Sequence, residues 1–172
     1  MGFLLLIPFF LIRFGLLSAL DREAVMRAAC FAPLQGREKA AYWFYQISNA
    51  AIVICPFFLP VKLFPGWFFA VGAAVYLAGV VLLVLSVAHF AAPAENGINQ
   101  NGIYRYSRNP MYVAYFVFFV GCALLMQSLI FSLFVAVFQA AAHWIILSEE
   151  RWCIGKFGEE YLRYMERVRR YF

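Results

Sequence analysis

Five long apolar stretches, separated by short polar segments, constrain this chain more than any other feature of its sequence. They occupy residues 2–20, 40–59, 64–90, 111–126 and 129–147. An α-helix rises about 1.5 Å per residue, so about 20 apolar residues cross the hydrocarbon core of a bilayer. We therefore expect an all-α integral membrane protein, folded as a bundle of five transmembrane helices.

The last two apolar stretches are separated only by Gln127 and Ser128. A single helix over residues 111–147 is the alternative, but it would be far too long for one crossing of the membrane. The spacing therefore predicts a tight hairpin between the fourth and fifth transmembrane helices.

The composition agrees with a membrane protein and indicates one domain over residues 1–172. The chain is 65% hydrophobic and 13% charged, whereas a soluble domain is about half apolar and about a quarter charged. A soluble protein of this length would have too little interior to bury so much apolar surface. The four cysteines are widely separated and form no CxxC pair, so we expect neither a metal site nor a disulfide framework.

The basic residues predict the orientation of the chain in the membrane. Residues 21–39, residues 91–110 and the tail after residue 147 are all basic, and with five spans they share one side, whereas the other side holds only Lys62. Since basic loops stay in the cytoplasm, we expect a cytoplasmic C-terminus and an external N-terminus. The net charge of +5 thus reflects membrane orientation and lipid contact, and we expect no nucleic-acid partner.

The C-terminal tail is predicted to form an amphipathic cytoplasmic helix. Its charged residues include favourable acid–base pairs four positions apart, and we expect it to lie on the lipid headgroups. Glycines at 155 and 158 should separate it from the fifth transmembrane helix. Its apolar residues recur at helical spacing, and they are Phe157, Tyr161, Met165, Val168 and Phe172.

The segment before the fourth transmembrane helix is a candidate anion site. Asn109 is expected to cap this helix, and Pro110 suits its first turn. Free backbone N–H groups would then lie beside Arg105 and Arg108, where a carboxylate or a phosphate could bind. The ordinary alternative is a capped helix whose arginines reach lipid phosphates.

A pair of adjacent carboxylates, Glu149 and Glu150, follows the fifth transmembrane helix and is a candidate cation site. An amine or a sulfonium would suit it, and a solvated helix face is the alternative. His143 precedes Glu150 by seven residues and so lies on the same helix face, about two turns away.

These motifs together resemble the isoprenylcysteine carboxyl methyltransferase family and the related phospholipid methyltransferases. The resemblance rests on RYSRNPMY at residues 105–112, then EERW at 149–152, then FGEEYLRY at 157–164. It covers roughly residues 96–172. The order and spacing of the three motifs carry it, since each motif alone is weak.

The resemblance implies an enzyme that binds S-adenosylmethionine from the cytosol and methylates a lipophilic acceptor reached from the bilayer. The catalytic half would be residues 91–172, with Arg108 and His143 as catalytic candidates. The helix start at Asn109 suits the carboxylate of the cofactor, and the glutamates suit its ammonium. The implied cofactor residues are Asn96, Gly97, Ile98, Asn99, Tyr104, Asn109, Pro110, Met111, Tyr112, Glu149 and Glu150.

The sequence departs from the family pattern in ways that leave the acceptor open. Asn109 stands where the family has His, Ala114 where it has Gly, and Ile145 where it has a substrate arginine. The acceptor group is a carboxylate, a thiol or an amine. A phospholipid amine N-methyltransferase is the alternative enzyme, with His143 or His89 as base, and a non-catalytic membrane protein is the other. So compact a chain fits a prokaryotic cytoplasmic membrane.

Overall fold

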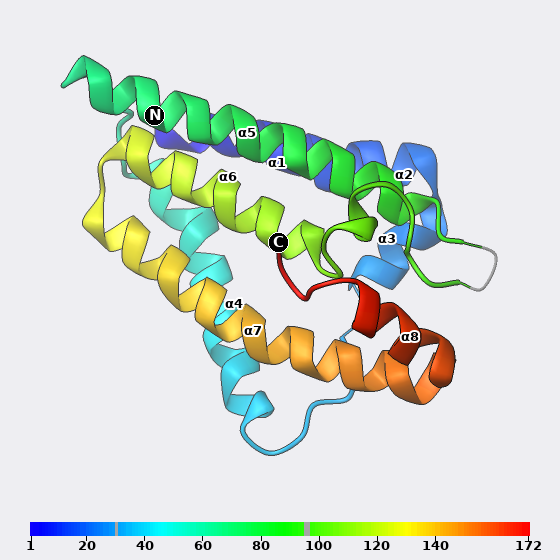
Figure 1. The fold of residues 1–172 in the computed structure, drawn as a ribbon. Helices are drawn as coiled ribbons and strands as arrows, with labels where there is room; N and C mark the ends of the chain where they lie inside the picture. Colours follow the sequence, from blue (N-terminus) through cyan, green and yellow to red (C-terminus); the bar gives the residue numbers. More distant parts are fainter. Residues whose placement is uncertain (30, 95–96) are drawn as a thin grey trace.

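The computed structural model describes residues 1–29, 31–94 and 97–172, and every regular element in these ranges is a helix (Figure 1). The all-α prediction is confirmed. The elements are η1 (Gly2–Leu6), α1 (Ile7–Phe10), η2 (Leu11–Leu16), α2 (Leu17–Leu20), α3 (Arg22–Ala29), α4 (Glu38–Ile54), η3 (Cys55–Phe57), α5 (Gly66–Ala91), η4 (Gly102–Arg105), α6 (Pro110–Met126), α7 (Leu129–Phe157) and α8 (Glu159–Arg167).

Three helical segments are long and apolar enough to cross a membrane: Gly2–Leu20, α5 and α7. Helix α6 is apolar but has 17 residues, and α4 also has 17. The other two of the five predicted spans correspond to these shorter helices, so the count of five stays a prediction. Within Gly2–Leu20, residues Leu11–Leu16 (η2) form a π-helix.

Small residues allow α5 and α6 to pack with their backbones close together. A Cβ on Gly79 would lie 2.5 Å from the Phe118 Cα, and one on Gly121 would lie 2.5 Å from the Tyr76 Cα. Such contacts are typical of helices that associate in lipid, where close backbone approach replaces the hydrophobic effect. Helix α4 packs along α7 and completes the bundle.

Aromatic side chains fill the space between the first helical segment and α6. The Phe9 ring centroid lies 5.7 Å from that of Phe118 and 5.2 Å from that of Phe119, and both α6 rings are buried. Other large apolar side chains, Trp43, Phe44 and Leu133 among them, are exposed on the outside of the bundle. An apolar exterior around a packed core is what a lipid environment requires.

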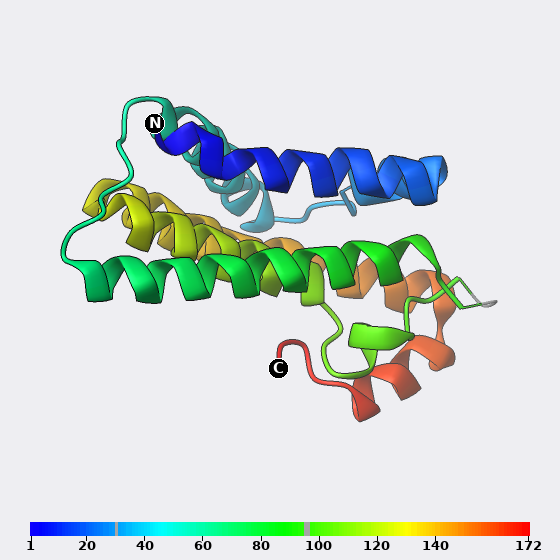
Figure 2. The same ribbon diagram turned by 90° about the horizontal axis from the view of Figure 1, so that it is seen from above.

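Hydrogen bonds at one end of the bundle join the start of the chain to the connection between α4 and α5, and join that connection to the end of α6. The Gly2 amide donates to Leu59 at 2.7 Å, and the Lys62 amide donates to Leu125 at 2.9 Å. At the opposite end, both views show the connection after α5 gathered with the end of α7 and with α8 (Figures 1 and 2). This second end holds the sequence motifs of interest.

The predicted break in the tail is wrong at Gly155 and confirmed at Gly158. Helix α7 runs through Gly155 to Phe157, because a glycine inside a helix lowers its stability by about 1 kcal/mol without ending it. Gly158 has φ 57° and ψ −133°, a backbone conformation open to glycine, and there the chain turns into α8. Helix α8 ends at Arg167, so Phe172 is not part of the predicted helical face.

Helix α8 buries one face against the protein itself. Tyr161 and Tyr164 are buried and form a cluster with Ile98, which lies in the connection between α5 and η4. The amphipathic helix thus holds the connection that contains the predicted cofactor loop.

Candidate active site

A cavity of about 620 Å³ opens at the end of the bundle where α7, α8 and the start of α6 meet. Two of the predicted site residues that the structure describes, Pro110 and His143, do not line it. Asn96 lies outside the described residues, Pro110 is buried directly before Met111, and His143 lies about two turns earlier in α7. The predicted residues that do line it are Gly97, Ile98, Asn99, Tyr104, Arg108, Asn109, Met111, Tyr112, Glu149 and Glu150.

The start of α6 has the expected position but not the expected cap. Asn109 occupies the N-cap position and Pro110 follows in the first turn, yet no side-chain hydrogen bond caps the helix. The Asn109 side-chain amide instead donates to the Arg170 carbonyl at 3.3 Å. The predicted N-cap position of Asn109 is confirmed, but its side chain makes no cap hydrogen bond and is directed instead toward the C-terminal tail.

Arg108 and Glu150 form a buried ion pair, with exposed side-chain fractions of 7% and 5%. The Arg108 Nε and Nη2 donate to one Glu150 oxygen at 3.0 and 2.8 Å. Its Nη1 donates to the carbonyls of Met165 and Val168, at 3.0 and 2.6 Å. These four bonds engage all three guanidinium nitrogens and connect the start of α6 to α7, to α8 and to the tail.

Arg170 binds the other oxygen of Glu150 and closes the tail over the start of α6. Its Nε and Nη2 donate at 3.0 and 2.8 Å, and this ion pair raises the pKa of the Arg170 guanidinium further. The Arg108 amide donates to the Arg169 carbonyl at 2.9 Å. Because arginines bind both of its oxygens, Glu150 stabilises the packing of α7 against the start of α6 and the tail. It is therefore not free to bind a ligand cation.

Glu149 has different surroundings from its neighbour. Its Oε1 accepts a hydrogen bond from the Tyr112 hydroxyl at 2.8 Å. It belongs to none of the four ion pairs among the described residues, and it lines the cavity. A carboxylate in such a place is costly unless a cation accompanies it, so Glu149 can receive a positively charged ligand group.

Four buried side-chain polar atoms among the described residues have no hydrogen-bond partner, and three of them belong to residues that line this cavity. These three atoms are Arg13 Nη1, Asn99 Oδ1 and the Tyr115 hydroxyl. Buried polar groups are almost always satisfied in folded proteins. The cavity therefore offers two donors and one acceptor to a ligand.

The sequence predicted a cofactor role for Asn99, which lines the cavity, but did not predict Arg13 or Tyr115 as cavity residues. Arg13 lies in the π-helix Leu11–Leu16, far from the motifs in sequence, and a π-helical turn often marks a functional site. That one intramembrane arginine was the available signal, because ionisable residues in membrane helices are costly and usually functional.

Aromatic rings form one wall of the cavity. Phe31, Phe90, Trp152 and Phe157 line it, and the Lys156 ammonium lies 4.7 Å from the Trp152 ring centroid. Flat apolar surfaces of this kind suit a heteroaromatic ring.

Two tyrosines that line the cavity, Tyr104 and Tyr164, are joined by a hydrogen bond. The Tyr164 hydroxyl donates to the Tyr104 carbonyl at 2.7 Å. Burial raises the pKa of Tyr104 and of Tyr164 well above the usual range of a phenol. Both hydroxyls therefore stay protonated at neutral pH.

Neither histidine lines the cavity. His143 Nδ1 lies 2.8 Å from the Tyr171 hydroxyl, so it contacts the C-terminal tail. His89 Nδ1 lies 2.7 Å from the Leu85 carbonyl within its own helix.

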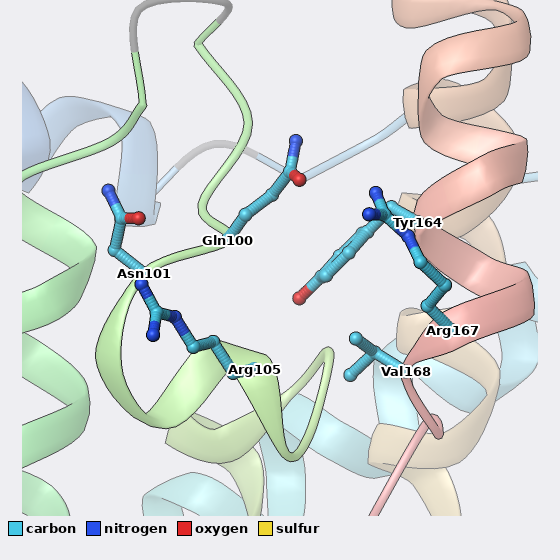
Figure 3. Close-up of a pocket in the computed structure, with 6 residues that line it drawn as sticks. All are labelled: Gln100, Asn101, Arg105, Tyr164, Arg167 and Val168. Carbon is cyan, nitrogen blue, oxygen red and sulfur yellow. The ribbon is translucent and has the colours of Figure 1, made fainter.

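A second, shallower pocket of about 400 Å³ lies outside the cavity, between η4 and α8 (Figure 3). Figure 3 shows the Tyr164 ring between the segment that carries Gln100, Asn101 and Arg105 and the side chain of Arg167. Arg105 and Arg167 are exposed and belong to no ion pair of the described residues. This basic surface faces the side on which we predicted lipid headgroups.

The sequence model of one family, phospholipid methyltransferase, matches residues 67–160, more than half of the chain. The match runs from α5 into α8 and so includes the start of α6 and both glutamates of α7. No curated protein and no solved structure is significantly similar to the chain.

Proposed function

The chain belongs to the phospholipid methyltransferase family, and on that premise we propose that it is an integral membrane enzyme that transfers a methyl group from S-adenosylmethionine to a lipophilic acceptor. One observation carries the proposal. Glu149 lines a cavity at the end of the bundle and forms no ion pair with any of the described residues. The sulfonium and ammonium of the cofactor are cations of the required size and charge.

The residues around the cavity fit the cofactor. Glu149 would hold its cationic part, and the first-turn N–H groups of Met111 and Tyr112, which no side chain caps, would hold its carboxylate. The aromatic wall suits adenine, and Asn99 Oδ1, buried and without a partner, is an acceptor for the adenine amino group. Bound there, S-adenosylmethionine would supply a methyl group already activated by its sulfonium.

Arg108 and His143, our catalytic candidates, are proposed to position other groups. Arg108 fixes Glu150, and thereby sets the orientation of the α7 end that carries Glu149. His143 holds the tail through Tyr171. In-line methyl transfer depends on alignment of the reacting atoms more than on acid–base groups, and these contacts supply alignment.

We propose a carboxylate oxygen as the acceptor, as in isoprenylcysteine carboxyl O-methylation. The acceptor oxygen would attack the methyl carbon while the S–CH₃ bond breaks, and the sulfur keeps the bonding electron pair. No proton moves in this reaction. An amine acceptor must lose a proton, and neither His143 nor His89 lines the cavity. This favours the O-methyltransferase over the phospholipid amine N-methyltransferase.

We also propose that the chain crosses the membrane five times, with a cytoplasmic C-terminus and an external N-terminus. Helix α4 passes into η3 with helical backbone angles at Cys55, which lengthens this segment. Helix α6, with 17 residues, spans about 25 Å. The tight connection at Gln127 and Ser128 would then face the outside. Arg105 and Arg167 would contact anionic lipid of the cytoplasmic leaflet, in a prokaryotic membrane.

Transfer of tritium from methyl-labelled S-adenosylmethionine tests the proposal. The protein in proteoliposomes is offered N-acetyl-S-farnesylcysteine as the carboxylate acceptor and phosphatidylethanolamine as the amine acceptor. We expect base-labile label on the first, as a methyl ester releases methanol in alkali. Base-stable label on phosphatidylethanolamine would support the N-methyltransferase instead. Label on neither, from folded protein, would support the non-catalytic alternative.

A further inference from the structure

One of the cationic side chains that line the cavity, Arg13, comes from the first helical segment and is opposite in charge to Glu149. Arg13 is the only charged residue of this otherwise largely apolar segment, Gly2–Leu20. A guanidinium at this depth is costly, so its hydrogen-bond partners are informative. The Arg13 Nη2 donates to the Ala28 carbonyl at 2.8 Å and thereby caps the C-terminal end of α3.

This hydrogen bond uses only Nη2, one of the two terminal nitrogens of the Arg13 guanidinium. The Arg13 Nη1 is buried and has no partner. The Tyr115 hydroxyl is also buried and has no partner with full hydrogen-bond geometry, although it lies close enough to Arg13 for the two side chains to interact. Both residues line the same cavity. A guanidinium nitrogen and a phenolic hydroxyl that point at no acceptor of the described residues are two donors in one place.

Arg13 and Glu149 share this cavity without pairing. Tyr45, Tyr104 and Tyr115 each lie within electrostatic range of both charges. None of the four ion pairs of the described residues joins them. In an apolar surrounding, opposite charges that stay apart leave room for a ligand that supplies a cationic group to one and an anionic group to the other.

We propose that Arg13 and Tyr115 form an oxyanion-binding site at the inner end of the cavity. The proposal rests on the proposed function and adds a recognition element for the substrate. Arginine is suited to such groups because its planar, permanently charged fork matches carboxylate and phosphate oxygens. Since the cofactor's carboxylate is assigned to the start of α6, the oxyanion held here is that of the acceptor.

A carboxylate and a phosphodiester are both oxyanions that an arginine can bind, so the experiment uses a separate ligand for each. Oleate supplies a carboxylate, with methyl oleate as its neutral control, and lysophosphatidylethanolamine supplies a phosphodiester. S-adenosylhomocysteine supplies the amino-acid carboxylate of the cofactor. Each is titrated calorimetrically into protein in lipid nanodiscs, with empty nanodiscs as the blank.

Two substitutions separate binding from folding. Arg13→Gln removes the charge, and it also weakens the cap on α3. Tyr115→Phe removes a hydroxyl that bonds to none of the described residues, so it should leave the unfolding temperature unchanged. Arg22→Gln is the matched control, because Arg22 is exposed and has no hydrogen bond or ion pair among the described residues.

We expect both substitutions to weaken the binding of one oxyanion acceptor probe at least tenfold. Binding of S-adenosylhomocysteine should change less than twofold, and Arg22→Gln should change neither. If S-adenosylhomocysteine is the probe that weakens, the oxyanion site stands and its ligand is the cofactor. Unchanged binding of all three probes in both variants would overturn the site. Failure of the wild type to bind S-adenosylhomocysteine would instead count against the proposed function.

Discussion

The hydroxyl of Tyr112 donates a 2.8 Å hydrogen bond to Glu149, whereas the next residue along the chain, Glu150, accepts from two arginines. Successive residues of a helix point about 100° apart, so these adjacent carboxylates enter different surroundings. Glu149 lines the cavity and forms no ion pair with the described residues, whereas Glu150 joins α6, α7 and the tail. Their substitutions should therefore have different consequences.

Glu150→Gln should lower stability more than any change at Glu149. It leaves the buried Arg108 guanidinium without a counter-charge, and removing one partner of a buried ion pair costs about 3–5 kcal/mol. Glu149→Gln keeps a hydrogen-bond acceptor for Tyr112 and should cost under about 1 kcal/mol. Thermal unfolding of both variants in one detergent compares them. Equal losses would contradict the separate roles assigned to the two glutamates.

Arg170→Gln should release the C-terminal tail from the start of α6. The substitution removes two hydrogen bonds to Glu150. We expect faster tryptic cleavage within residues 163–170, followed by mass spectrometry. Arg169→Gln is the matched control, since the Arg169 side chain is exposed and has no bond among the described residues. A tail that is cleaved at the same rate in both variants would argue against closure by Arg170.

Stability should depend on pH through Glu38 and Arg151. Two hydrogen bonds from the Arg151 guanidinium, at 2.6 and 2.7 Å, lower the pKa of Glu38 from 4.5 to about 2. A carboxyl with a lowered pKa in the folded state stabilises the protein above its unfolded-state pKa, and this contribution is lost as the pH falls from about 4.5 towards 2. The unfolding temperatures of wild type and Glu38→Gln should differ at pH 6, and this difference should shrink as the pH falls and disappear only below about pH 2.

Glu23→Gln serves as the control for this pH series, because Glu23 is exposed and forms none of the four ion pairs of the described residues. It should follow the wild type throughout. A constant difference between wild type and Glu38→Gln across the pH range would contradict a charge-dependent contribution.

Two glycines should respond oppositely to alanine. Gly79→Ala places a Cβ against the backbone of Phe118 and forces α5 away from α6, with a cost of about 1–3 kcal/mol. Gly155 lies inside α7 with no atom within 4 Å of the added Cβ. Its replacement should stabilise the helix by up to about 1 kcal/mol. Unfolding temperatures that shift in the same direction would contradict the helix packing described above.

The sequence predicted those parts of the molecule that depend on local pattern. Apolar length located the helices, Pro110 marked the start of α6, and the motifs at residues 105–112 and 149–152 contain side chains that meet in one cavity. The helical spacing in the tail was informative as far as Arg167, where α8 ends.

The contacts that could not be predicted from the sequence join residues that are far apart in the chain. No periodicity links Arg170 to Glu150, or Arg13 to Tyr115, and the tail's capture of the Asn109 amide depends on the fold of both segments. Likewise, which glutamate pairs with the arginines and which bonds only to Tyr112 follows from the rotation of α7 against α6, which only the packed bundle defines.

Calorimetric titration of S-adenosylhomocysteine into the wild-type protein, with Glu149→Gln and Glu159→Gln alongside, tests the central claim most directly. Glu159 lies on exposed α8 surface and forms none of the ion pairs of the described residues, so it controls for loss of one negative charge. We predict micromolar binding that weakens at least tenfold, about 1.4 kcal/mol, in Glu149→Gln and persists in Glu159→Gln. A folded wild type that binds no S-adenosylhomocysteine, or equal binding in all three proteins, would contradict a cofactor site built on Glu149.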